Sequence, residues 1–216
     1  MLHLHLLIII IIIIVVVVGV NTEAILADNA IPPQLPNQFS CERIQTVVQG
    51  AGPARKSNIT LFFDLPREMQ YIRDYTEGPV VQSWSLLGGK NPRIYTWDPI
   101  DIPPPSCVCI HQGSSQLLPE FLPLSNASYG GTAVLRGVKC AKWVVSGAIL
   151  PGDTYTVWVV AKKNSPSIPL RTQWIDPGTK GTGTIVETND YFHFMPVQPP
   201  TSIFTPKGPC KTVKCG

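Results

Sequence analysis

The chain has 216 residues, of which 14% are charged, and its formal net charge at pH 7 is +3. Its basic residues are scattered, so the charge gives no support to a nucleic-acid partner, which needs a concentrated basic surface. The sequence has no Gly-x-Ser-x-Gly elbow and no phosphate loop ending in Gly-Lys-Ser/Thr, which argues against two common enzyme classes.

The chain opens on an apolar leader. Residues 2–20 are almost all Leu, Ile or Val, and no charged residue interrupts them. Small residues follow at Ala24 and Ala27, three apart, which is the pattern that signal peptidase accepts. We therefore expect a signal peptide over residues 1–27 and a protein that is secreted or delivered to the secretory or lysosomal lumen. An uncleaved anchor is the alternative, because the run approaches the roughly 20 residues that span a bilayer.

The rest of the chain has the length of one domain. We expect a proline-rich arm over residues 28–40 and a single disulfide-stapled domain over 41–216. Proline is unfavourable inside helices and central strands, so the proline clusters mark this arm and the loops. The only helical stretches that the pattern allows are 116–121 and 125–129.

Alternating apolar residues predict β-strands through the domain. The strongest signals are residues 57–63 and 154–161, in which every second side chain is apolar. Weaker strands are expected at 69–75, 80–87, 93–97, 108–111, 132–138, 170–174 and 184–195. Short strands separated by turns predict a mainly all-β fold, as a curved antiparallel sheet in the form of a half-open barrel or a two-sheet sandwich.

Several strands carry bulky apolar groups on both faces. The alternation places Tyr191 and Met195 opposite Phe192 and Phe194. Two explanations stay open at this point. Either a sandwich with overlying loops buries both faces, or a curved sheet encloses an apolar cavity of the kind that lines small-molecule sites.

The cysteines are even in number and all lie beyond the leader. Six cysteines in an oxidising compartment predict three disulfides, although counting does not fix their pairing. Cys107 and Cys109 should each pair elsewhere, because a loop between them would be too small. Zinc binding is the weaker alternative, since no Cys-x-x-Cys spacing occurs. The six are Cys41, Cys107, Cys109, Cys140, Cys210 and Cys215.

Other motifs indicate modification rather than catalysis. Asn58-Ile-Thr and Asn126-Ala-Ser are N-glycosylation sequons, which suit an exported chain. His111 and His193 each lack a second histidine at ligand spacing, so we expect structural or surface roles for both. We therefore expect no catalytic residue, no metal and no cofactor.

The segment Gly137-Val-Lys-Cys-Ala-Lys-Trp143 resembles the Gly-x-x-Cys-x-x-Trp signature of the ependymin-related and eukaryotic LolA-like secreted proteins. The likeness continues in the same order through residues 155–159, 168–170 and 191–194. It closes at Phe204-Thr-Pro-Lys-Gly-Pro-Cys210, with one extra residue, and upstream it includes Cys107-Val-Cys109 and residues 118–123. It covers roughly residues 41–210.

This resemblance implies a strongly curved antiparallel sheet around a hydrophobic pocket for lipid-like molecules, with dimers common. It also implies that Cys41 bonds to Cys140, and that Cys107 and Cys109 bond to Cys210 and Cys215. It offers no catalytic residues.

We therefore expect a secreted, non-enzymatic protein that binds lipid or fatty-acid-like ligands. A homodimer is a possible assembly, and a membrane is a partner only if the leader is uncleaved. The alternative is a glycosylated matrix or adhesion protein with a filled core, and a hydrolase using His111 or His193 is the weakest reading. The expected ligand-binding side chains are Trp84, Leu86, Tyr95, Trp97, Val157, Val159, Phe192 and Phe194.

Overall fold

The computed structural model of the protein describes residues 31–76, 78–100, 106–113, 116–162, 165–178 and 183–215. The expected leader, residues 1–27, lies outside the described residues, as does the start of the expected arm. The chain divides into two compact units, Met1–Pro32 and Pro33–Gly216, and the fold described below is that of the second. Within the described ranges, no helix has the length and apolar character needed to cross a membrane.

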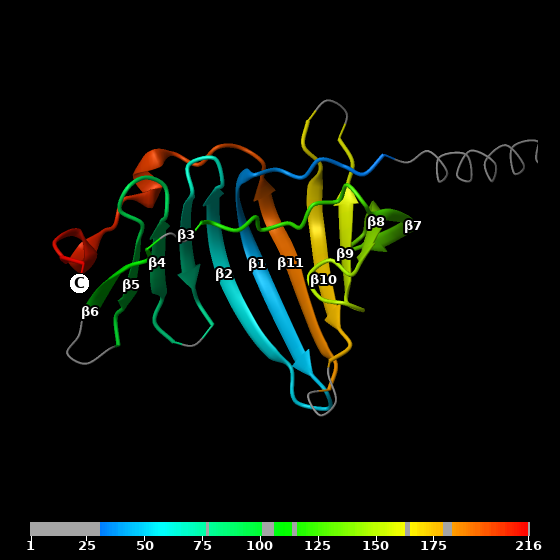
Figure 1. The fold of residues 1–216 in the computed structure, drawn as a ribbon, viewed down its shortest axis with the longest axis horizontal. Coiled ribbons are helices and arrows are strands. Elements are labelled where there is room, and N and C mark those ends of the chain that lie inside the picture. The colour runs from blue at the N-terminus through cyan, green and yellow to red at the C-terminus, as the bar shows by residue number, and fades with distance from the viewer. Residues whose placement is uncertain are drawn as a thin grey trace, which may run out of the picture. The chain divides into compact units, whose positions relative to one another are not determined.

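In the described part of the second unit, eleven β-strands form one antiparallel sheet, which confirms the predicted all-β class (Figure 1). The sheet consists of two up-and-down meanders that meet where β1 pairs with β11, and its order is β6-β5-β4-β3-β2-β1-β11-β10-β9-β8-β7. The first meander contains β1 (Gln38–Gln49), β2 (Arg55–Asp64), β3 (Met69–Asp74), β4 (Val81–Leu86), β5 (Arg93–Asp98) and β6 (Ser106–His111). The second contains β7 (Ser128–Leu135), β8 (Val138–Ser146), β9 (Thr154–Val160), β10 (Ile168–Asp176) and β11 (Ile185–Met195).

The sheet is curved and open. Each strand twists with the same hand, so an antiparallel sheet of more than about ten strands curls. Its two faces are covered by different segments. We call the face that carries Leu61 the strap face, and the face that carries Trp84 the tail face.

Two errors in the strand prediction have local causes. The central strand β1 was not predicted, because Glu42, Arg43 and Gln45 interrupt its apolar alternation. The expected strand 132–138 spans a hairpin, since β7 ends and β8 begins there. Arg136 and Gly137 form the turn with φ values of 51° and 77°, and two-residue hairpins favour positive φ at both central positions.

A β-bulge changes which face of the sheet the last residues of β11 occupy. His193 has φ 48°, and the pairing with β1 shifts register between Ser40 and Glu42. The extra residue brings Tyr191 and Phe194 onto the same face, where their rings meet edge to face at 6.2 Å. The simple alternation, which put these two side chains on opposite faces, is therefore wrong at this point.

The prediction of at most two short helices is confirmed, but the predicted positions are wrong. Among the residues that the structure describes there are two 3₁₀ helices, η1 (Thr201–Phe204) and η2 (Gly208–Lys211). Residues 116–121 form no helix, and residues 125–129 form a turn and the start of β7.

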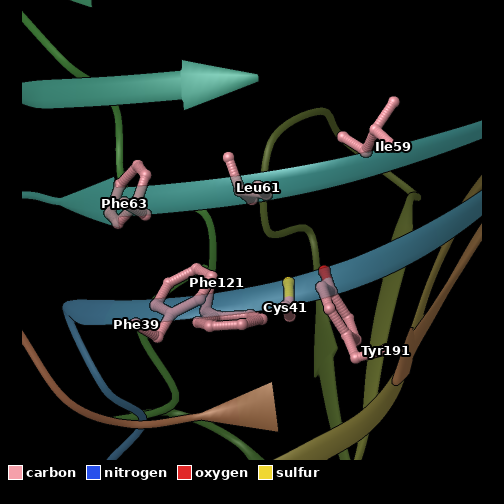
Figure 2. Packing of buried hydrophobic residues seen from close by; sticks show 7 residues of the cluster. All are labelled: Phe39, Cys41, Ile59, Leu61, Phe63, Phe121 and Tyr191. Carbon is pink, nitrogen blue, oxygen red and sulfur yellow. The ribbon is translucent and has the colours of Figure 1, made fainter. Parts of the chain in front are cut away.

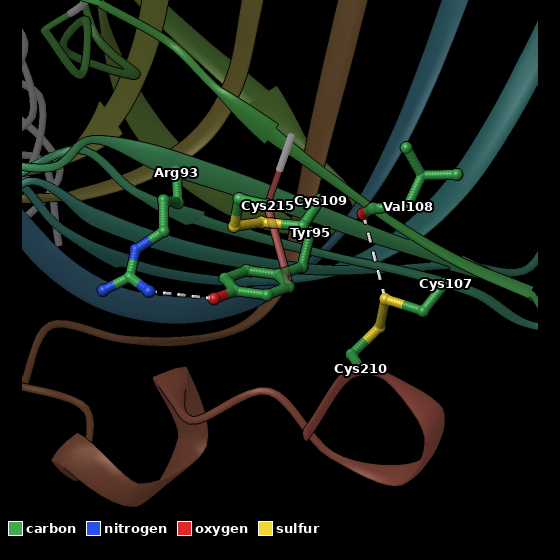
Figure 3. Close-up of a disulfide and its surroundings, with 7 residues drawn as sticks. All are labelled: Arg93, Tyr95, Cys107, Val108, Cys109, Cys210 and Cys215. Atoms are coloured by element: carbon green, nitrogen blue, oxygen red, sulfur yellow. Dashed lines mark hydrogen bonds between the residues drawn. A yellow bond between two sulfur atoms is a disulfide. The ribbon is translucent and has the colours of Figure 1, made fainter. Parts of the chain in front are cut away.

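The C-terminal tail, residues 199–215, covers the tail face of the first meander. Phe204 and Cys210 pack there against Tyr71, Trp84 and Tyr95, all at most 7% exposed. Two disulfides fasten this tail to β6, one between Cys107 and Cys210 and one between Cys109 and Cys215 (Figure 3). These are partners that the family resemblance implied. They suggest an oxidising environment, either extracellular or within the secretory pathway.

The third expected disulfide is absent. Cys41 and Cys140 are both buried free thiols. Cys41 lies on the strap face among Leu61 and Phe63, whereas Cys140 alternates with strap-face residues of β8 and so points to the tail face. The prediction of three bridges and the implied pairing of Cys41 with Cys140 are therefore wrong.

This arrangement predicts the outcome of thiol counting on the purified, folded protein. Alkylation of the native protein should modify no cysteine rapidly, because both free thiols are at most 3% exposed. Alkylation after denaturation without reductant should modify two, Cys41 and Cys140, and reduction should raise the number to six. Mass spectrometry of the alkylated chain makes the measurement, and denatured protein without a free thiol would contradict the structure.

Candidate binding site beneath the strap

The connection from β6 to β7 crosses the strap face of the sheet. Because β6 and β7 are the two edge strands, this connection has to pass over the strands between them, as Figure 1 shows. We call its residues 116–124 the strap. They contain no helix or strand, because Pro119 and Pro123 remove backbone donors and restrict the residues before them. The strap is therefore held by its side chains.

An aromatic cluster fixes the middle of the strap. The Phe121 ring lies 5.4 Å from the ring of Phe39 and 5.4 Å from that of Tyr191. Phe39 in turn stacks on Phe63 at 5.2 Å and on Phe194 at 4.8 Å. Figure 2 shows Phe121 lying over the cluster from β1, β2 and β11. Buried aromatic pairs contribute about 0.5–1.5 kcal/mol each beyond their burial.

A largely buried ion pair holds the strap beside this cluster. Arg43 Nη1 donates to Glu120 Oε1 at 2.5 Å, and the two side chains are only 17% and 11% exposed. The Tyr191 hydroxyl donates to the same carboxylate oxygen at 3.1 Å. Burial alone would lower the pKa of Arg43, but Glu120 and Tyr191 outweigh burial and raise that pKa. The Arg43 guanidinium and the Glu120 carboxylate are therefore closely tied.

The nucleophile-type groups near the strap are held in their neutral forms. Burial, reinforced by the charge of Glu120, raises the pKa of the Cys41 thiol. The same two causes raise the pKa of Tyr191. Because the thiolate is the reactive form of cysteine, this environment makes Cys41 a packing residue.

The first of two pockets beside the strap is mostly apolar. It has a volume of about 290 Å³, near the lower end of the roughly 300–1,000 Å³ typical of small-molecule sites. Leu35 and Leu65 belong to the partly buried residues that pack against the aromatic cluster. The lining comprises residues 33–37, Phe63, Leu65 and strap residues 119–124.

The second pocket is smaller and more polar. Its volume is about 160 Å³, and it shares Glu120 and Leu122 with the first pocket. The strap therefore borders both pockets. The lining comprises Glu120, Leu122, Ile149, Tyr155, Thr172, Trp174, Glu187 and Asn189.

A buried carboxylate organises one wall of this second pocket. Asp153 is 1% exposed and accepts hydrogen bonds from the backbone amides of residues 148–150 and from Trp174 Nε1 at 2.7 Å. Burial alone would raise the pKa of Asp153, but these hydrogen bonds outweigh burial and lower that pKa. Asp153 thus fixes the loop that carries Ile149 and the ring of Trp174.

The eight side chains expected to bind ligand do not converge. Trp84 and Tyr95, with the adjoining Leu86 and Trp97, form the core beneath the C-terminal tail. Phe192 lies on the same face, with the Arg136 guanidinium 4.2 Å from its ring. The strap face holds the remaining three, Val157, Val159 and Phe194.

None of the eight is among the residues that line either pocket. The first pocket is lined mainly by the strap and the arm, and the second by the strap and by residues of β9, β10 and β11, none of which the sequence analysis expected to bind a ligand. The Leu-Pro-Glu-Phe-Leu-Pro run at 118–123 was the available signal, but its apolar residues were read as a short helix.

The remaining candidate residues lie away from the pockets. His111 is exposed on β6, and His193 Nδ1 lies 3.1 Å from Glu42 on the tail face. Within the described ranges, no three His, Cys, Asp or Glu side chains lie close enough together to hold a metal ion. Asn58 and Asn126 are both exposed, so glycosylation at the two sequons stays a prediction.

Comparisons with known proteins give a structural similarity without a family. No family model matches the chain, and no curated protein matches it. The crystal structure of LolA superfamily protein NE2245 from Nitrosomonas europaea is similar, with 13% identity and a TM-score of 0.45. The match covers 83% of this chain and 94% of that one. This similarity does not assign the chain to a family, and the site is therefore interpreted from its own geometry.

The ion pair predicts a large effect when one partner is removed. Glu120→Ala leaves the buried Arg43 charge without its carboxylate, so the free energy of unfolding should fall by about 3–5 kcal/mol. Glu42→Ala is the matched control, because Glu42 lies on the tail face and its side chain is 53% exposed. Chemical denaturation of both variants makes the measurement. Equal, small losses would show that the strap is not held by this pair.

Proposed function

We propose that the chain is a non-enzymatic binding protein that holds a hydrophobic molecule, such as a lipid or fatty-acid-like compound, on the strap face of its sheet. The observation that carries this proposal is an apolar pocket of about 290 Å³ that is bordered by the strap, a segment without regular structure, and by residues 33–37. Pockets for small molecules are usually concave and mostly apolar.

The strap is the replaceable part of this site. Its central contact with the sheet is the Phe121 side chain, which adjoins the first pocket and covers Phe39 and Phe194. An alkyl chain that took the place of this ring would bury comparable apolar surface, at about 0.8 kcal/mol for each buried methylene. With the strap in place, the pocket of about 290 Å³ has room for only a short alkyl chain. Displacing the Phe121 ring would enlarge it.

The chemistry around the pockets supports a carrier more than an enzyme. The Cys41 thiol and the Tyr155 and Tyr191 hydroxyls all have raised pKa values because they are buried. Such groups favour packing over nucleophilic attack. Reversible apolar contact is the function that these residues can supply.

The close packing of the strap face favours one competing function, that of a matrix or adhesion protein without a ligand. Phe39 and Leu61 are completely buried, and Phe63 is 1% exposed, so much of the strap face is already occupied by the protein's own side chains. A glycosylated matrix or adhesion protein would need only such a filled scaffold. The carrier requires that a ligand can displace the strap, whereas the matrix or adhesion protein does not.

Binding of an apolar fluorophore distinguishes them. The purified protein should bind N-phenyl-1-naphthylamine with enhanced fluorescence, and organic extraction of protein from its natural source should release lipid. Leu35→Trp should weaken fluorophore binding about tenfold or more, because the larger ring fills the first pocket, of which Leu35 is a wall.

The control for this experiment is Ile44→Trp, which adds the same ring at a position that is 37% exposed on the tail face of β1. This control should leave binding unchanged. The carrier proposal would be wrong if the unmodified protein bound no fluorophore and released no lipid, and the filled scaffold would then be favoured.

A further inference from the structure

The second pocket differs from the first in its chemistry. Its lining includes two carboxylates, Glu120 and Glu187, and the polar groups of Tyr155, Thr172 and Asn189. Because Glu120 and Leu122 belong to both linings, the apolar and polar pockets lie against the same piece of strap. That juxtaposition suits an amphiphile rather than a purely apolar molecule.

Two buried atoms of this lining lack hydrogen-bond partners. The Tyr155 hydroxyl and Asn189 Oδ1 are both inaccessible and unpaired, and their residues are 6% and 9% exposed. The Leu122 backbone and the Thr172 side chain lie close to the Tyr155 hydroxyl, but neither meets hydrogen-bond geometry. Unpaired buried polar atoms are uncommon. A ligand that moved the Leu122 backbone would gain access to the Tyr155 hydroxyl, and Asn189 belongs to the same lining.

The charge of the pocket is not balanced. Arg43 neutralises Glu120. Glu187 Oε1 instead accepts hydrogen bonds from two neutral amides, Gln45 Nε2 at 2.8 Å and Asn189 Nδ2 at 2.9 Å. The described lining residues include no Lys, Arg or His, so the pocket carries an excess negative charge. A carboxylate head group would be repelled there.

We infer that the second pocket binds the protonated primary amine of an amphiphile whose alkyl chain occupies the first pocket. An ammonium group has three N–H donors and no acceptor. The Glu187 carboxylate, Asn189 Oδ1 and the neutral Tyr155 hydroxyl are three acceptors that match it. A volume of about 160 Å³ corresponds to roughly five water molecules at ~30 Å³ each, which is enough for an ammonium group and its first carbons.

This inference rests on the proposed function and narrows its ligand class. It favours long-chain amines over fatty acids of the same chain length, although both have the same apolar part. The preference should come from Glu187, since the charge of Glu120 is already paired.

The test compares three twelve-carbon amphiphiles, each below its aggregation concentration. Dodecylamine, dodecanol and dodecanoate compete with N-phenyl-1-naphthylamine on the full mature protein at pH 7. Dodecylamine should bind about tenfold more tightly than dodecanol, and dodecanoate more weakly than either, because a hydrogen bond to a charged group is stronger than one between neutral groups.

Glu187→Gln should remove most of the amine preference, and an unchanged circular dichroism spectrum and thermal midpoint would show that the variant is folded. Glu42→Gln is the matched control on the tail face and should retain the full preference. If dodecanoate binds as well as dodecylamine, or if Glu187→Gln leaves the preference intact, the head-group inference is overturned while the carrier function stands. If no amphiphile displaces the fluorophore and the fluorophore itself does not bind, the proposed function fails first.

Discussion

The packing of Phe121 and the pairing of Glu120 with Arg43 determine the state of the strap face. These two contacts place an irregular segment over the junction of β1 and β11, where the two meanders meet. The strap has no helix or strand of its own, so its position depends on side-chain contacts. Without these contacts the apolar side chains beneath Phe121 would be exposed to solvent. The same strap residues also border the two pockets.

The other face of the sheet has a different and more permanent cover. The C-terminal tail is joined to β6 by two disulfides and to the turn after β2 by Arg67, which donates to the Pro199 carbonyl at 3.0 Å. Arg67 is itself paired with the buried carboxylate of Asp64. The tail face of the first meander is thus covalently sealed, whereas the strap is held by an ion pair and ring contacts. This difference supports the strap face as the place where a ligand would compete.

The sequence predicted much of the fold because strand signals are local. Apolar alternation located β2 and β9 and most of their neighbours, and it assigned Leu61 and Val157 correctly to buried positions. It failed at β1, where Arg43 occupies an inward position because of a partner 77 residues away. It failed at His193 as well, since a one-residue bulge exchanges the faces of the residues beyond it. In both places the residues depart from simple apolar alternation, so a search for that pattern misses them.

The site was less predictable than the fold. The first pocket is lined mainly by the strap and the arm, in which prolines remove the alternation that identifies strands. The large aromatic residues chosen from sequence, such as Trp84, proved to pack beneath the tail. A free Cys41 was also unexpected, because an even cysteine count favours complete pairing. Which apolar residues remain available to a ligand depends on what covers each face, and that is a property of the tertiary structure.

The central claim is that the strap fills the strap face and can be replaced there by a ligand. The most direct measurement is the distance between spin labels at Leu118→Cys on the strap and Ile44→Cys on β1, which are 78% and 37% exposed and so accept labels. On saturation with dodecanol, the distance distribution should shift to longer values and broaden, while a pair within β2 and β3 stays unchanged. An unaltered strap distance with bound ligand would contradict the account.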